Sequence, residues 1–242
     1  MKTVIKGDEG FVNELIVKAI EKKYGKKRVF SNLSAALTHN RFVVLLGANG
    51  SGKSTFLKIC AGLAPIETGS LSLNGQSSRA ERAIQSSYVS EESGFDPYKT
   101  PFIILEDQTK LLNEFKLAAA KDMCINIDLP LHTRCGELSA GQRHLLSLIV
   151  AIGGSKPFIF IDEVLANLDT AKKAAMLSIL TDLLVEEDRM VVIATHAYEN
   201  VEMLADGVIF LRDGRAEVIS DIEEYRYTNG KSLKDLFAGV GK

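Results

Sequence analysis

Residues 42–55 read FVVLLGANGSGKST, and this stretch decides the fold. Its first five residues are all apolar, which is typical of a strand buried on both faces of a sheet. The glycine-rich loop that follows matches the phosphate-binding pattern G-x-x-x-x-G-K-S/T in full. A helical pattern then begins at Ser54, so the order is strand, loop, helix. This order predicts a phosphate-binding loop in an α/β protein.

The chemistry expected of this loop follows from its residue types. Glycines let the backbone turn sharply and aim its N–H groups at a phosphate, to which the helix N-terminus adds its positive dipole end. Lys53 can reach the β- and γ-phosphates of a nucleotide, and the Ser54 hydroxyl can ligate Mg²⁺. The alternative is a chance glycine-rich turn, which the Lys-Ser-Thr ending disfavours. The predicted nucleotide-binding residues of the loop are Gly47, Ala48, Asn49, Gly50, Ser51, Gly52, Lys53, Ser54 and Thr55.

Residues 158–163, FIFIDE, place two acids after another apolar strand, at the end where open α/β sheets bind ligands. Asp162 is predicted to hold Mg²⁺ through water. Glu163 is placed to polarise the attacking water as a general base. Taken alone, two acids after an apolar strand usually mark a solvated strand end. The complete phosphate-binding loop upstream favours the catalytic interpretation.

Residues 138–142, LSAGQ, precede a further helical pattern. A Ser N-cap and bare backbone amides at a helix N-terminus can bind an anion, although such a segment in isolation is most simply a capped helix start. In this position, 20 residues before Phe158, the sequence resembles the ATP-binding-cassette (ABC) family, whose signature is usually Leu-Ser-Gly-Gly-Gln. The resemblance implies that the segment faces the γ-phosphate held by an opposite subunit. It adds the predicted nucleotide-binding residues Ser139, Ala140, Gly141 and Gln142.

Further matches follow in the family's order, so that the resemblance extends roughly from Leu15 to Arg215. It implies that Tyr24 stacks on adenine and that the loop ending in Asp169 links two active sites across a dimer. It also implies that His196 contacts the γ-phosphate as a second catalytic residue. A lone Tyr is more often plain packing, and a lone His is more often a surface or core residue.

The sequence departs from the family's pattern at one position of chemical importance. The family usually carries a glutamine that contacts magnesium, and alignment of the preceding residues puts Glu91 there. Glu91 is therefore predicted as a magnesium ligand together with Ser54 and Asp162. Ala140 stands for the usual Gly of the signature, and Val164 stands for the usual Pro after the catalytic Glu. Neither change removes a group that performs chemistry, so we expect an active ATPase.

Composition limits the class of protein. Apolar residues make up 46% and charged residues 25%, ordinary values for a soluble globular chain. The net charge of −2 offers no footprint for non-specific nucleic-acid binding, so no nucleic-acid partner is expected. The three cysteines have no metal-ligand spacing and are expected to be reduced and packed. With no signal-peptide pattern and no apolar run near 18 residues, the expected location is cytoplasmic, peripheral at the cytoplasmic face of a membrane.

Strands alternating with helices predict an α/β fold. We expect a P-loop NTPase core with a mainly parallel sheet, an N-terminal antiparallel β subdomain and a small helical insert. The chain, 1–242, is expected to be a single ABC nucleotide-binding domain whose insert covers approximately 92–150. The detailed expectations are early strands at 15–20 and 29–37, hairpins at 74–75 and 213–214, and one helical run over 104–122.

The leading interpretation is the ATP-hydrolysing subunit of an ABC membrane transporter. Its cofactors would be ATP and Mg²⁺, and its partners a second ABC subunit, most simply a homodimer, and an integral membrane subunit. Export is favoured over import because residues 232–237, SLKDLF, faintly resemble the tail of exporter cassettes. The docking surface for the membrane subunit is expected between Glu91 and Leu105. Its predicted apolar contacts are Phe95, Tyr98, Phe102 and Ile103.

Two other classes of function remain open at this point. The first is a soluble ABC-type ATPase that acts as a mechanical or assembly scaffold without a transport role. The second is a nucleotide sensor without hydrolysis, which the presence of both Glu163 and His196 disfavours.

Overall fold

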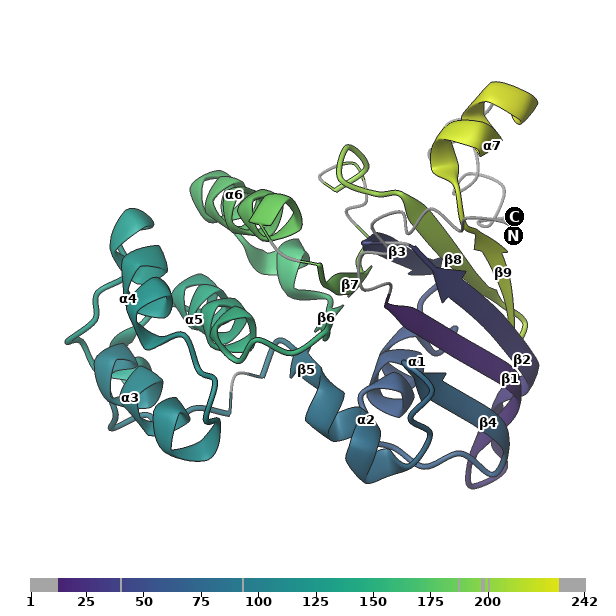
Figure 1. Ribbon diagram of the computed structural model, residues 1–242, viewed down its shortest axis with the longest axis horizontal. Coiled ribbons are helices and arrows are strands. Elements are labelled where there is room, and N and C mark those ends of the chain that lie inside the picture. Colours follow the sequence, from purple (N-terminus) through teal and green to yellow (C-terminus); the bar gives the residue numbers. More distant parts are fainter. Residues whose placement is uncertain are drawn as a thin grey trace, which may run out of the picture.

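A computed structural model describes residues 13–39, 41–92, 94–186, 188–196, 199 and 201–230. At its centre lies a six-stranded sheet with the order β5-β6-β7-β3-β8-β9 (Figure 1). The first five of these strands run parallel, and β9 is antiparallel to β8. The mainly parallel α/β fold and the terminal hairpin are therefore confirmed. The strands are β3 (Phe42–Gly47), β5 (Ser86–Val89), β6 (Phe158–Asp162), β7 (Met190–Ala194), β8 (Gly207–Arg212) and β9 (Arg215–Ile219).

The central strands are buried on both faces because their side chains alternate between two apolar clusters. In β3, Val44 belongs to the cluster that also contains α5 and α6, whereas Val43 belongs to the cluster that contains α1. Figure 1 shows the same layering, with α5 and α6 together on one side of the sheet. Every residue of β3, β6 and β7 is buried, as the continuous apolar runs predict. The helices next to the sheet are α1 (Lys53–Cys60), α2 (Arg79–Gln85), α5 (Ala140–Gly153) and α6 (Thr170–Glu186).

A second, antiparallel sheet has the order β2-β1-β4 and covers α1 from the other side. Its strands are β1 (Glu14–Tyr24), β2 (Lys27–Thr38) and β4 (Thr68–Leu73). The turn between β1 and β2 needs Gly25, whose φ is 58°. This sheet confirms the predicted N-terminal antiparallel β unit.

The turn of the hairpin predicted at residues 74–75 is present, but the second strand is not. The chain does turn there, with positive φ at both residues, but only a single bridge follows, between Leu73 and Gln76. Ser78 then caps α2: its Oγ accepts a hydrogen bond from the Glu81 N–H at 3.2 Å, and the Glu81 carboxylate accepts one from the Ser78 N–H at 3.0 Å. This capping box starts a helix where a second strand was expected.

The helical run predicted over residues 104–122 is divided in two. Phe115 lies between α3 (Pro101–Leu111) and α4 (Leu117–Asn126) and is buried against Gly153 of α5, where an added Cβ would lie 2.7 Å from the Phe115 ring. The Lys116 N–H also donates to the Gly153 carbonyl oxygen at 2.8 Å. This packing breaks the periodic sequence pattern. The remaining helices are α3 (Pro101–Leu111), α4 (Leu117–Asn126) and α7 (Ile222–Asn229), with 3-10 turns η1 (Cys135–Glu137) and η2 (Val164–Asn167).

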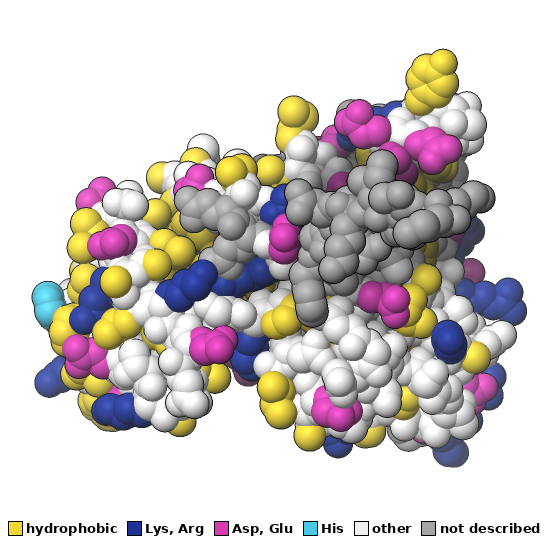
Figure 2. Space-filling view, viewed as in Figure 1, with side chains coloured by type: hydrophobic (Ala, Val, Ile, Leu, Met, Phe, Trp, Pro, Cys, Tyr) yellow, Lys and Arg dark blue, Asp and Glu magenta, His cyan; other side chains and the backbone are white. Residues whose placement is uncertain are grey.

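The chain's cysteines and surface agree with its composition. Cys60, Cys124 and Cys135 are buried and form no disulfide, as expected of packed, reduced residues. Within the described residues, no helix combines the length and the apolar character needed to cross a membrane. Figure 2 shows acidic and basic side chains scattered over the visible face. The segment 232–237, on which the export prediction rests, lies outside the described residues.

Candidate active site

The phosphate-binding loop is shaped by glycines that no other residue could replace. Gly52 has a φ of 105°, and a Cβ there would lie 2.7 Å from the Phe30 ring. A Cβ on Gly47 would lie 2.5 Å from Ser51 Oγ and 2.7 Å from the Leu211 carbonyl oxygen. The loop closes on itself through the Ser51 N–H, which donates to Ala48 O at 3.1 Å. The backbone therefore needs glycine at these positions on steric grounds.

Three predicted residues meet where the parallel strands end. Lys53 is buried, and its Nζ donates to the Gly47 carbonyl oxygen at 3.0 Å. The same Nζ lies 3.5 Å from Glu163 Oε1 and 3.2 Å from His196 Nε2. His196 Nε2 in turn lies 3.1 Å from Glu163 Oε1. A cation, a carboxylate and an imidazole that are far apart in sequence thus form one cluster.

Glu163 has an unusual backbone conformation. Its φ of 56° falls in the left-handed region, which residues other than glycine rarely adopt. The Glu163 N–H donates to the Ala194 carbonyl oxygen of β7 at 2.9 Å, and this bond helps hold the conformation. Such strain at a strand end is characteristic of functional positions.

Asp162 is buried, and each oxygen of its carboxylate accepts one hydrogen bond. Ser54 Oγ donates to Oδ1 at 3.0 Å, and the Tyr88 hydroxyl donates to Oδ2 at 2.7 Å. Burial first, and then the neighbouring carboxylate, raise the pKa of Tyr88 well above its ordinary value. Tyr88 therefore remains a donor. Sequence reasoning missed Tyr88, because no motif marks a tyrosine in the middle of β5.

The predicted metal ligands Ser54, Asp162 and Glu91 line one cavity of ≈ 260 Å³, together with Glu163. Hydroxyl and carboxylate oxygens suit Mg²⁺, which in nucleotide sites takes one or two protein carboxylates and completes its shell with phosphates and water. Among the described residues, no group of three or more His, Cys, Asp or Glu side chains could hold a metal by itself. That sparse donor set fits a magnesium ion bound with a nucleotide.

A second cavity of ≈ 310 Å³ lies in front of the phosphate-binding loop. Tyr24 is at its rim with 52% of its surface exposed, and Lys22 Nζ lies 4.9 Å from the centre of the Tyr24 ring. An exposed aromatic at this place is available to stack on a base. The cavity is lined by Tyr24, Lys27, Val29, Asn49, Gly50, Gly52, Lys53, Ser54, Thr55 and Glu163.

The LSAGQ segment forms the start of α5. Ser139 is its N-cap: Ser139 Oγ accepts from the Gln142 N–H at 3.2 Å, and Gln142 Oε1 accepts from the Ser139 N–H at 2.9 Å. Gly141 is buried beneath the Lys172 side chain, which forms an ion pair with Asp169. This pairing lowers the pKa of Asp169. Neither the segment 139–142 nor Asp169 lines the two cavities at the phosphate-binding loop.

A comparison with protein families decides the identity of this arrangement. The family model described as "ABC transporter" matches residues 30–166, more than half of the chain. The chain belongs to the ABC transporter family. It is accordingly an ATP-binding ATPase, as its sequence motifs predict.

Named relatives place it among the ATP-binding proteins of this family. It is 30% identical to the Nod factor export ATP-binding protein I of Burkholderia orbicola over 245 residues, which cover 92% of this chain and 80% of the relative. It is also 30% identical to the nickel import ATP-binding protein NikE of Shigella flexneri over 209 residues, which cover 80% of this chain and 78% of that protein.

A solved structure supports the fold. The structure titled "Structure of ATP binding subunit of ABC transporter" superposes with a TM-score of 0.80 at 23% identity, covering 94% of this chain and 99% of the other. The ABC fold, with its parallel sheet, antiparallel unit and helices, is therefore confirmed.

One further contact joins two parts of this ABC chain. His144 lies a turn after Gly141 on α5 and is buried. Its Nε2 donates to the Glu91 carbonyl oxygen at 2.9 Å, since a carbonyl can only accept, and its Nδ1 has no hydrogen-bond partner within the described part of the chain. The helix that Ser139 caps is thus bonded to the loop that carries the predicted metal ligand Glu91. A lone histidine in a helix gives no sequence signal for this contact.

Proposed function

We propose that this chain is the ATP-hydrolysing subunit of an ABC membrane transporter and that it binds Mg²⁺-ATP between two copies of itself. One observation carries the proposal: within one chain, the α5 N-terminus at Ser139 lines neither cavity of the phosphate-binding loop. The helix end can bind an anion, and the phosphate-binding loop holds one. Because the two do not meet within one chain, they are complementary halves of one nucleotide site. A second copy, facing the first, supplies the missing half to each.

The proposed roles follow from the contacts. Lys53 Nζ and His196 Nε2 both contact Glu163 Oε1, and both can turn to the γ-phosphate of ATP. Glu163 is then free to accept the proton of the attacking water. Bound Mg²⁺, held by Ser54, Asp162 and Glu91, would neutralise charge on the phosphates.

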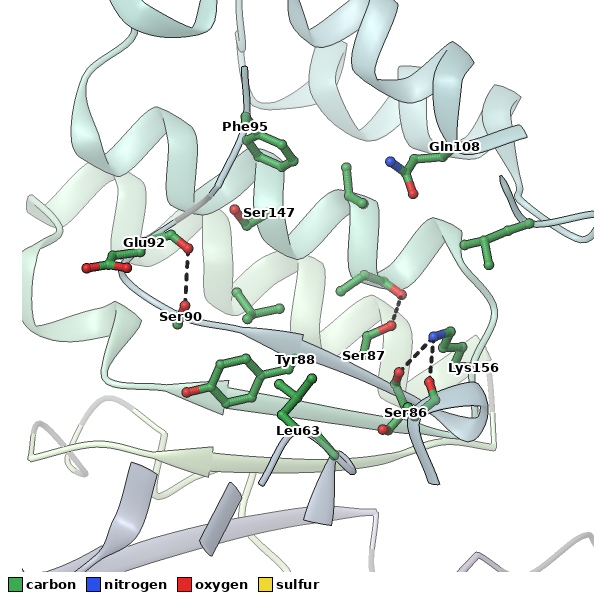
Figure 3. Close-up of a pocket in the computed structure, with 16 residues that line it drawn as sticks. Leu63, Ser86, Ser87, Tyr88, Ser90, Glu92, Phe95, Gln108, Ser147 and Lys156 are labelled. Atoms are coloured by element: carbon green, nitrogen blue, oxygen red, sulfur yellow. Dashed lines mark hydrogen bonds between the residues drawn. The ribbon is translucent and has the colours of Figure 1, made fainter. Parts of the chain in front are cut away.

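We propose that the membrane subunit docks in a groove of ≈ 380 Å³ between the sheet and the helical lobe, which comprises residues 94–153 (Figure 3). Leu63, three residues after the end of α1, lines the groove and is 52% exposed, and Phe95, Leu112 and Val150 line the lobe side. Of the four apolar residues expected from the sequence, only Phe95 lines this groove. Phe102 instead packs between His132 and Lys121 on the lobe.

The overall organisation and location complete the proposal. The whole chain, 1–242, would be one nucleotide-binding domain with its helical insert at approximately 92–150, peripheral at the cytoplasmic face of the membrane. Export is the proposed direction, supported by the sequence of residues 232–237 and by the name of the Nod factor export relative. The nickel import relative is named for the opposite direction, so transport assays with inside-out vesicles are the test of direction.

A substitution at Ser139 tests the composite site. Asp caps helices as well as Ser does, so Ser139→Asp should keep α5 intact while placing a negative charge where the opposite γ-phosphate would dock. We expect ATP affinity of the isolated chain to stay within about twofold and turnover to fall at least about tenfold, because like charges in contact repel strongly in a partly dry site. Calorimetry and a phosphate-release assay measure the two quantities.

The matched control is Ser78→Asp, which changes an equivalent capping box at the start of α2. It should leave both affinity and turnover unchanged. Full turnover in Ser139→Asp would contradict the composite site, and equal losses in both variants would trace the effect to helix capping.

A further inference from the structure

We propose that Tyr88 is a positioning residue for the magnesium-binding carboxylate of Asp162, an inference that rests on the proposed metal site. The Tyr88 hydroxyl donates to Asp162 Oδ2 at 2.7 Å, a short bond of the charge-assisted kind. Ser54, itself a predicted metal ligand, donates to the other oxygen, Oδ1, at 3.0 Å. Ser54 and Tyr88 thus each hold one oxygen of the carboxylate, and all three residues line the metal cavity.

The register of the sheet explains how Tyr88 reaches this carboxylate. Strands β5 and β6 are parallel, with Tyr88 paired to Phe160, two residues before Asp162. Residues two apart on a strand share a face, so Phe160 and Asp162 point to the same side as the paired tyrosine. The Tyr88 ring packs against the cluster that contains Phe160, and its hydroxyl extends toward the strand end. A phenylalanine would fill the same space without the bond.

Tyr88 also forms the boundary between two hollows of the molecule. It lines the metal cavity with Asp162 and Glu91, and it lines the groove between the sheet and the helical lobe. Figure 3 shows it on β5 at the groove, its hydroxyl directed toward the end of the strand where Ser90 and Glu92 lie. A ligand that shifts β5 from the groove side would therefore move the donor that orients the metal carboxylate.

A purely structural role would make a different prediction from a positioning role. If Tyr88 only satisfied a buried acid, its loss would lower the melting temperature and leave the metal dependence of nucleotide binding unchanged. If it aims the carboxylate, its loss would weaken the contribution of Mg²⁺ to nucleotide binding specifically.

The test is Tyr88→Phe, measured by calorimetric titration of a non-hydrolysable ATP analogue with Mg²⁺ and with EDTA. We expect affinity in EDTA to be unchanged and the Mg²⁺ concentration for half-maximal enhancement to rise about fivefold, as loss of one such hydrogen bond implies. Tyr98→Phe, which removes a hydroxyl from an exposed tyrosine of the helical lobe, is the matched control and should change neither quantity.

Several outcomes would overturn the proposal. An unchanged Mg²⁺ dependence in folded Tyr88→Phe does so directly. If that variant does not fold, Tyr88→Met gives the same test, and failure of both to fold would assign the bond a structural role only. Absence of any Mg²⁺ effect on nucleotide binding by the unmodified chain would instead contradict the proposed metal site.

Discussion

The Lys53 ammonium lies out of water between the Gly47 carbonyl oxygen, the Glu163 carboxylate and the His196 imidazole. Among the described residues that line the 310 Å³ cavity, the cations are Lys27 and Lys53, and of these two Lys53 contacts Glu163 and His196. Charge-assisted hydrogen bonds are worth about 1.5–3 kcal/mol each. Lys53 is therefore expected to contribute more to ATP binding than any other single side chain.

Lys53→Ala should weaken ATP binding at least about tenfold, because it removes a charge-assisted bond to the phosphates. Calorimetry on the folded variant measures the effect. Lys18→Ala, which removes an exposed lysine from β1, is the control and should bind normally. Unchanged affinity in Lys53→Ala would place the nucleotide elsewhere.

Residues of this cluster were predictable because each belongs to a motif at a strand end. Lys53 follows β3, Glu163 follows β6 and His196 follows β7, and neighbouring parallel strands deliver their ends to one edge. Tyr88 was not predictable, because its contact depends on the pairing register of β5 with β6. Single-sequence patterns carry no information about that register.

At the scale of elements, the long apolar strands and the capped helix α5 agree with the sequence patterns, and two elements differ. After β4, the Ser78–Glu81 capping box starts a helix in place of the second strand of the predicted hairpin, and this capping signal is present in the sequence. The division between α3 and α4 has no local signal, because it depends on the packing of Phe115 against Gly153. Local chemistry predicts the first kind of feature, whereas only tertiary packing decides the second.

Helix α5 connects two predicted parts of the site, the signature segment at its N-terminus and the loop that carries Glu91. Its N-cap is Ser139, and His144 bonds the Glu91 carbonyl at 2.9 Å. The loop from β5 that carries Glu91 also borders the groove, through Ser90 and Glu92. A partner that binds in the groove would therefore contact elements bonded to both the metal cavity and α5.

The substitution Leu63→Glu tests whether the membrane subunit docks in the groove. Leu63 is already half exposed, so a charge there should leave the chain folded and its basal ATPase within about twofold of normal, as surface substitutions usually do. In a docked interface the same charge would lose its hydration, which costs free energy. The variant should therefore not associate with membranes that contain the transporter partner. Co-sedimentation of the chain with those membranes is the measurement.

Ile125→Glu is the matched control, because Ile125 is 60% exposed on α4 and does not line the groove. It should sediment with the membranes normally. Retained association of Leu63→Glu would place the docking surface on another face.

At the scale of the whole molecule, the family and the α/β fold are established. The central question is whether a single chain contains every part of the ATP-hydrolysing site. Ser139 and Asp169 do not line the cavities at the phosphate-binding loop and the predicted magnesium ligands. The chain's size and charge allow a second copy to approach, since the net charge is only −2 and long-range repulsion between copies is small. The proposed dimer that closes on ATP would bring these residues to the phosphate-binding loop of the opposite copy.

The most direct test of this claim is the mass of Glu163→Gln in solution with ATP and Mg²⁺. The variant lacks the proton acceptor for hydrolysis but keeps the groups that bind nucleotide, so the ATP-bound assembly should persist. Sedimentation equilibrium should give a dimer with ATP and Mg²⁺, a monomer with EDTA, and a monomer again when Ser139→Asp is added. A Glu163→Gln chain that binds ATP and Mg²⁺ yet remains monomeric at every protein concentration would contradict the account.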